Sequence, residues 1–317
     1  MWQIDLFGGA PQWIGPEGAP DPAPPPIVAS DISPRQLDLT EPALIHRNAG
    51  IRHLIRLEVD MARREIEAAG ASFSDHGERI REEMALVDRV AALLALGERS
   101  SELAAGIESL RDSEWSEAIR GAVAQVRAAL HVYLGECIER EHGPAGIAGQ
   151  LVAGEAFLLG GDRARAIASL ERTLATRPRD ARRWIALGNA HHPAEAGAAR
   201  MAYLAAYLVD RSAVDDQQVN DDEVRVLASS ADTEVEADDP RAWLPVLGVF
   251  AGLFAPRLPP AIAETVAPDD DGSRFFHLMV AAEAARHRGE AIVPLRRQMR
   301  GLSPDVFARY LEWIGSR

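Results

Sequence analysis

The sequence contains no lysine, because all 34 of its basic residues are arginine. A chain without lysine has no Walker-type phosphate loop, no Schiff-base lysine and no lysine general base. Cysteine is almost as scarce. Cys137 is the only one, which excludes an internal disulfide and a cysteine zinc cluster. It falls on an apolar helical stripe, which predicts a small buried thiol.

Positive charge is also in deficit, with 34 basic against 48 acidic residues and a formal net charge of −14. This excess disfavours a phosphate backbone as a partner, because that contact needs clustered cations. The start of the chain lacks the basic region and long apolar run of a secretory signal. The longest apolar run, residues 243–255, is too short to span a bilayer. We therefore expect a soluble cytoplasmic protein that binds neither nucleic acid nor membrane directly.

Hydrophobic periodicity predicts helices along most of the chain. Residues 8–35 hold eight of the twenty prolines, which predicts an extended linker. Residues 210–239 hold eleven acidic side chains, which predicts a solvated loop with one short helix near 221–230. Apolar residues recur at helical spacing over 40–69, 76–96, 101–111 and 114–141. A further helix is expected at 240–254, followed by helices that end at Trp313. No segment beyond the first few residues alternates like a strand, so the predicted class is all-α.

Residues 147–211 contain two copies of one helix–turn–helix unit. Gln150, Gly154 and Phe157 recur 34 residues later as Trp184, Gly188 and His191. In the second half of each unit, the residues recur after 33 positions: Ala166, Leu170, Thr173 and Pro178 correspond to Ala199, Tyr203, Ala206 and Arg211. The glycines and alanines are expected where the two helices of a unit cross, since close packing there leaves no room for larger side chains. Leu170 and Tyr203 are expected to fill the gap between units.

This pattern resembles the tetratricopeptide repeat, whose period is 34 residues. The resemblance implies an α-solenoid of antiparallel helix hairpins, preceded by an irregular, proline-rich N-terminal arm. A degenerate third unit is expected at 275–304, where Ala282, Ala285 and Ala291 partly repeat the pattern. The predicted organisation is an arm at 1–35, N-terminal hairpins at 36–145, the repeat pair at 146–212 and a C-terminal helical region at 213–317.

The resemblance also implies a groove lined by the first helix of each unit, which holds a peptide or a partner helix. Glu155, Arg183 and Asn189 are the predicted partner-binding residues, because they stand on first helices at positions that are neither helix crossings nor contacts between units. Arginine and asparagine there would hold a carboxylate or a peptide backbone. The sequence thus predicts a non-enzymatic adaptor within a bacterial complex, with a protein or peptide partner.

The N-terminal sequence Gln3-Ile4-Asp5-Leu6-Phe7 resembles the pentapeptide by which bacterial proteins dock on the replicative sliding clamp. By this resemblance Leu6 and Phe7 would enter an apolar pocket and Gln3 would bind beside it. The alternative is an extended arm that folds Trp2, Ile4 and Leu6 onto the helical body. A replication or repair accessory recruited through residues 3–7 is therefore a second functional hypothesis.

No catalytic, cofactor or metal motif is evident in the sequence. The Glu-x-x-His of Glu139 and His142 lacks the second copy that a di-iron bundle needs. Asp269-Asp270-Asp271-Gly272 lacks the later ligands of a calcium loop and is better interpreted as a helix-capping turn. An enzyme whose site is assembled from scattered Asp, Glu and His remains a third hypothesis, with perturbed pKa values in a deep pocket as its expected sign.

Overall fold

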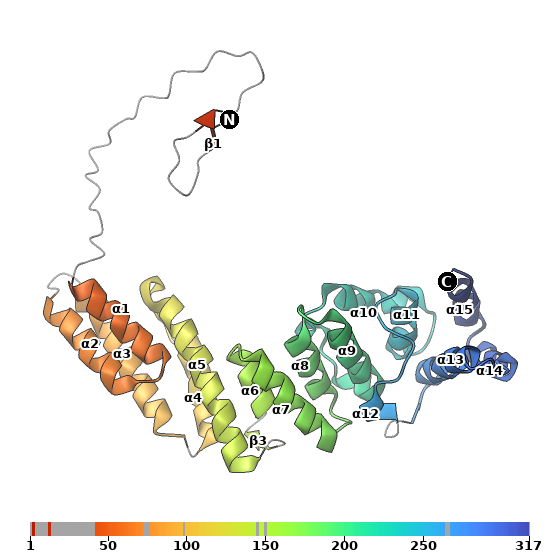
Figure 1. Ribbon diagram of the computed structural model, residues 1–317, viewed down its shortest axis with the longest axis horizontal. Helices are drawn as coiled ribbons and strands as arrows, with labels where there is room; N and C mark the ends of the chain where they lie inside the picture. The colour runs from red at the N-terminus through yellow and green to blue at the C-terminus, as the bar shows by residue number, and fades with distance from the viewer. Residues whose placement is uncertain are drawn as a thin grey trace. The chain divides into compact units, whose positions relative to one another are not determined.

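The computed structural model describes residues 42–72, 77–97, 99–143, 146–148, 151–263 and 267–316, together with the strand residues 2–3 and 12–13. Fifteen α-helices occur within these residues, and the described strands are only two residues long. The all-α prediction is therefore confirmed. The chain divides into two units, residues 1–41 and 42–317, and the helices belong to the second (Figure 1).

The first five helices follow the predicted periodicity, with one correction. The single long helix expected over 40–69 is two helices that pack against each other as a hairpin, because the chain reverses at Leu57, whose φ is +61°. This hairpin was missed because a helical period continues on both sides of a short break. The five helices are α1 (Pro42–Ile55), α2 (Val59–Ser72), α3 (Gly77–Leu94), α4 (Ser100–Asp112) and α5 (Glu117–His142).

The predicted repeat region contains two helix hairpins. A short antiparallel pair, β3 (Ile147–Ala148) and β4 (Leu151–Val152), occupies its start, so the expectation of helix from residue 147 is wrong. The four helices that follow are α6 (Ala153–Leu159), α7 (Arg163–Thr176), α8 (Ala181–His191) and α9 (Ala196–Asp210). Each packs against the next, and α6 also contacts α8, so the first helices of the two hairpins are neighbours.

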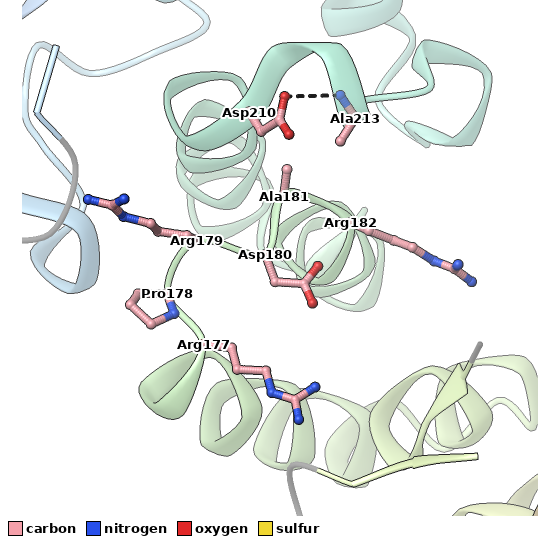
Figure 2. A pocket seen from close by; sticks show the side chains of 8 residues that line it. All are labelled: Arg177, Pro178, Arg179, Asp180, Ala181, Arg182, Asp210 and Ala213. Atoms are coloured by element: carbon pink, nitrogen blue, oxygen red, sulfur yellow. Dashed lines mark hydrogen bonds between the residues drawn. The ribbon is translucent and has the colours of Figure 1, made fainter. Parts of the chain in front are cut away.

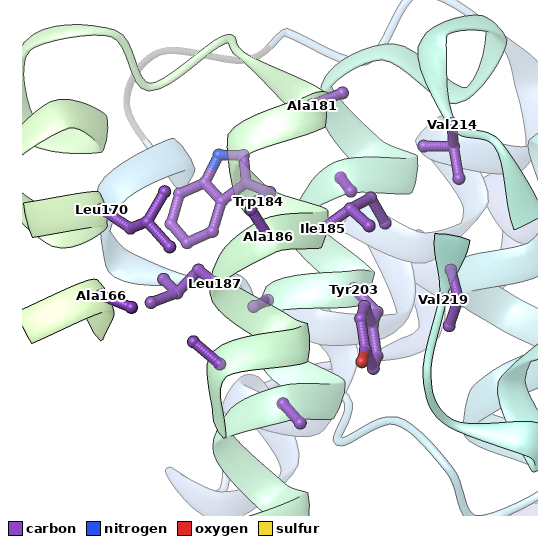
Figure 3. Packing of buried hydrophobic residues seen from close by; sticks show 14 of the residues in the cluster. Ala166, Leu170, Ala181, Trp184, Ile185, Ala186, Leu187, Tyr203, Val214 and Val219 are labelled. Atoms are coloured by element: carbon purple, nitrogen blue, oxygen red, sulfur yellow. The ribbon is translucent and has the colours of Figure 1, made fainter. Parts of the chain in front are cut away.

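In each hairpin, one glycine lies where the two helices cross, as the sequence predicts. A Cβ atom on Gly154 would lie 2.6 Å from Leu170 Cγ and 3.1 Å from the Ala166 carbonyl oxygen. A Cβ atom on Gly188 would lie 2.3 Å from the Tyr203 ring. Each contact lies within its own hairpin, so Leu170 and Tyr203 also pack at the helix crossings, in addition to the gap between units where the sequence predicts them. Figure 3 shows the buried Leu170 directed also toward the indole of Trp184 on α8.

The α1–α2 hairpin repeats this crossing geometry. A Cβ atom on Gly50 would lie 2.6 Å from Ile66 Cγ1 and 3.2 Å from the Ala62 carbonyl oxygen. Gly50, Ala62 and Ile66 have the same spacing along the chain as Gly154, Ala166 and Leu170. A third hairpin of this kind thus lies at the N-terminal end of the helices. In the unit expected at 275–304, by contrast, Ala291 is exposed and precedes a helix, so it does not lie at a helix crossing of this kind.

The acidic segment 210–239 is more ordered than the predicted solvated loop. It forms the short helices η1 (Arg211–Ala213) and η2 (Asp216–Gln218) and the helix α10 (Asp222–Glu234). Asp210, Asp215 and Asp221 each precede one of them and accept hydrogen bonds from its first backbone N–H groups. Acidic side chains are favoured there because a helix start carries unpaired N–H groups and partial positive charge. The apolar Val214, Val219 and Val224 anchor the segment in the core.

The last helices enclose an aromatic cluster. Phe275 packs 5.6 Å from Trp243 and edge-on to Tyr310, measured between ring centroids, and Tyr310 stacks on Trp313 at 6.1 Å. The elements concerned are η3 (Pro240–Trp243), α11 (Leu244–Phe250), α12 (Pro260–Ala263), α13 (Asp271–His287), α14 (Val293–Leu302) and α15 (Pro304–Gly315). This cluster connects helices that are distant in sequence, which hydrophobic periodicity alone does not predict.

Candidate functional site

Two of the predicted groove residues form a buried ion pair. Arg183 Nη1 on α8 lies 3.2 Å from Glu155 Oε1 on α6, and both residues are buried. Arg182 Nε approaches the same oxygen to 3.2 Å, and the Val152 N–H donates to Glu155 Oε2 at 3.1 Å. Burial raises the pKa of Glu155, although Arg183 and Arg182 oppose that shift. The expectation that these positions make no contact between units is wrong, because facing side chains of adjacent first helices meet.

Asn189 also makes internal contacts. Its Nδ2 donates to the Gln218 carbonyl at 2.7 Å, and its Oδ1 accepts from the Tyr203 hydroxyl at 2.8 Å and from the Asn220 N–H at 3.0 Å. The side-chain amide therefore joins α8, α9 and the segment before α10. Asn189 is only partly buried, but its polar atoms stabilise the fold.

The N-terminal motif lies almost wholly outside the described residues. Gln3 belongs to β1 (Trp2–Gln3), which pairs antiparallel with β2 (Gln12–Trp13), so that Gln3 stands opposite Gln12. Leu6 and Phe7 are not among the described residues. Recruitment to a sliding clamp through Gln3, Leu6 and Phe7 stays a prediction.

The acidic and histidine clusters that the sequence singled out have structural positions. Within the ranges that the structure describes, no group of three or more His, Cys, Asp or Glu side chains is arranged to hold a metal ion. Asp270 caps α13, as predicted, with its carboxylate accepting from the Ser273 N–H at 2.7 Å. Among those same residues, no helix combines the length and apolar character that crossing a membrane requires.

A pocket that the sequence did not reveal opens at the turn between α7 and α8. Its volume is about 820 Å³, and it is lined by residues 177–182 together with Asp210 and Ala213 at the end of α9 and in η1. In the view of Figure 2, Arg177 and Arg182 extend to one side of this turn and Arg179 to the other. Three arginines therefore contribute to the lining of one open pocket in a chain whose net charge is negative.

The two carboxylates of this pocket are already engaged by backbone groups. Asp180 is the N-cap of α8 and accepts from the Arg183 N–H at 3.3 Å. Asp210 accepts from the Ser212 hydroxyl at 2.6 Å and from the Ser212 and Ala213 N–H groups. These hydrogen bonds, led by the one from the Ser212 hydroxyl, hold the pKa of Asp210 below its usual value. Among the arginines of the lining, Arg182 pairs with Glu155 at 3.2 Å, and Arg179 is also engaged within the fold.

The turn that carries the arginines is held by the core beneath it. The indole Nε1 of Trp184 donates to the Pro178 carbonyl oxygen at 2.9 Å, and Trp184 is buried between α7 and α8 (Figure 3). Pro178 restricts the backbone of the turn further. The arginines on either side of it therefore project from a fixed backbone. The sequence signal was the run RPRDARR at residues 177–183, which places four arginines around a proline turn.

No protein-family model matches the chain, and no curated protein and no solved structure shows significant similarity to it. Its function is therefore inferred from the side chains and surfaces described above. The pocket at the α7–α8 turn combines volume, accessibility and more arginine than acidic side chains in its lining, and it is the candidate functional site.

Proposed function

We propose that the protein is an interaction scaffold that binds an acidic segment of a protein partner at the α7–α8 turn. The observation that carries this proposal is the lining of the pocket by Arg177, Arg179 and Arg182, of which Arg177 and Arg179 are exposed and Arg182 also pairs with Glu155. Guanidinium groups bind carboxylates through paired, charge-assisted hydrogen bonds. An open pocket of about 820 Å³ accommodates several residues of an extended segment.

The hairpins supply the rigidity that such a site needs. Gly154 and Gly188 bring the helices of each hairpin into close contact, and the Glu155–Arg183 pair joins one hairpin to the next. A rigid backbone reduces the entropy that is lost when side chains are ordered on binding. The buried polar residues that the sequence suggested as partner contacts therefore support the site from within.

The proposal is tested by measuring the binding of a fluorescein-labelled peptide of alternating Glu and Gly residues, with the corresponding Gln peptide as the neutral comparison. Fluorescence anisotropy should show binding of the acidic peptide only. Arg177→Gln combined with Arg179→Gln, two exposed arginines of the lining, should weaken that binding by at least about tenfold, since each charge-assisted hydrogen bond contributes about 1.5–3 kcal/mol.

The matched control is Arg297→Gln combined with Arg300→Gln, two exposed arginines on α14, which removes the same charge from a different surface. Circular dichroism verifies that both double variants keep their helices. Equal binding of the acidic and neutral peptides would contradict the proposal. So would an equal loss of binding in the control variant, since that would assign the effect to net charge.

A further inference from the structure

A second pocket, separate from the α7–α8 turn, lies between the start of α9, the loop after α11 and the last helix α15. Its volume is about 510 Å³, within the range of small-molecule sites. Met201, Leu253 and Trp313 give it apolar walls, and Gly197 and Gly252 line it without side chains. A Cβ atom on either glycine would meet no other atom within 4 Å, so the space beside them is open.

The walls of this pocket are fixed by contacts outside it. Phe254 packs on Gly248, where a Cβ atom would lie only 2.1 Å from the ring. Gly252 has φ of +75°, which turns the chain so that the Leu253 N–H donates to the Gly248 carbonyl oxygen at 2.8 Å. Trp313 stacks on Tyr310 at a centroid distance of 6.1 Å. The apolar surface is therefore formed before a ligand arrives, which lowers the entropic cost of binding.

The charges at the pocket have one sign. Arg200 and Arg257 line it, and no Asp or Glu of the described residues does. Arg200 Nε donates to the buried Asp221 at 2.9 Å, and Arg200 also pairs with Glu223, so its charge is balanced within the fold. Arg257 is exposed and forms no ion pair with any carboxylate of the described residues. The pocket thus combines an apolar interior with one arginine whose charge is not balanced by any carboxylate in the part of the chain that the structure describes.

We propose that this pocket binds a small apolar carboxylate, such as an aryl-substituted short-chain acid. The aryl group would lie against Met201, Leu253 and Trp313, where burying apolar surface contributes about 25 cal/mol per Å². The carboxylate would pair with Arg257, which a guanidinium does with two parallel hydrogen bonds. An anion is the expected ligand because the pocket offers guanidinium groups and no acidic side chain among the described residues.

The test uses 4-phenylbutyrate as the probe, with 4-phenylbutyramide and butyrate as comparisons that lack the charge and the ring. Saturation-transfer NMR and titration of the full chain should show binding of 4-phenylbutyrate, with both comparisons about tenfold weaker or more. Arg257→Gln should weaken binding of the acid by about tenfold and bring it to the level of the amide.

Gly197→Leu provides the second variant, because its side chain would enter the open space of the pocket while α9 keeps a good helix former. It should abolish binding of the acid. Gly301→Leu on α14, where a Cβ atom also meets nothing within 4 Å, is the matched control and should bind normally.

Three results would overturn the proposal: no binding of 4-phenylbutyrate, equal binding of acid and amide, or undiminished binding by the Gly197→Leu variant. None of them bears on the acidic-peptide site, whose test uses Arg177 and Arg179.

Discussion

The guanidinium of Arg183 on α8 lies 3.2 Å from the carboxylate of Glu155 on α6, and both side chains are buried. This pair connects the two central hairpins. A buried charge that loses its partner is costly to the folded state, commonly by about 3–5 kcal/mol. The pair therefore holds the helices together only while both members are present.

Replacing Arg183 by Met should accordingly lower the free energy of unfolding by about 3 kcal/mol, because Arg182 is then the one cationic neighbour of Glu155 among the described residues. Glu155→Gln should cost less than Arg183→Met, because burial already raises the pKa of Glu155 against its charged form. Urea unfolding measures both. Arg172→Met, which breaks the exposed pair with Glu139, should cost less than about 1 kcal/mol. A similar loss in all three variants would argue against a special role for the buried pair.

Gly154→Ala should destabilise the protein although alanine is the better helix former. The new Cβ atom would lie 2.6 Å from Leu170 Cγ and 3.0 Å from the Leu170 backbone nitrogen, so the two helices must separate. Overpacking of this kind costs about 1–3 kcal/mol. Gly121→Ala on α5, where a Cβ atom meets nothing within 4 Å, should instead stabilise by about 0.5–1 kcal/mol. Thermal unfolding of the two variants should shift the midpoint in opposite directions, and a shift of the same sign would disagree with the close helix crossing.

His131 should make the stability depend on pH. Burial and then the positive charge of Arg127 lower the pKa of this histidine from 6.5 to about 4, while Glu108, 4.0 Å from its Nε2, opposes the shift. At pH values between these two pKa values, His131 is therefore protonated in the unfolded chain and neutral in the folded chain. The contribution of His131 to the free energy of unfolding is fully present above about pH 6.5 and is lost as the pH falls toward 4. Between pH 7 and pH 5 this loss is about 2 kcal/mol.

His131→Leu should reduce that loss, as measured by urea unfolding at the two pH values. His287→Leu, which replaces an exposed histidine of α13, is the control and should leave the loss unchanged. If the His131→Leu variant loses as much stability as the parent chain, the acid sensitivity belongs to other groups.

Leu6→Ala combined with Phe7→Ala tests the resemblance of residues 3–7 to a clamp-binding peptide. The double variant should lose binding to a purified bacterial sliding clamp, because both apolar side chains would leave its pocket, and its circular dichroism should stay unchanged. Gln12→Ala is a suitable control, since it alters the N-terminal unit outside the motif. Undiminished binding by the double variant, or no binding by the parent chain, would reject this hypothesis.

Periodicity along the sequence was sufficient for the helical class and for most helix positions. It worked because an amphipathic helix must present apolar residues every three to four positions wherever it packs. Gly154 and Gly188 could be placed at helix crossings for a similar local reason, since only a small residue allows two helices to approach so closely. The break at Leu57 escaped notice because a helical pattern on both sides conceals a reversal of three residues.

The sequence alone determined the helical class, most helix positions and the two glycines at which hairpin helices cross. The tertiary structure decided which polar side chains face solvent. The sequence pattern predicted an open groove position for Glu155, Arg183 and Asn189. In the structure all three make contacts with neighbouring elements. Arg177 and Arg182 came together with the end of α9 for the same reason. A periodic pattern describes one helix at a time, whereas a pocket depends on distances between elements that are remote in the chain.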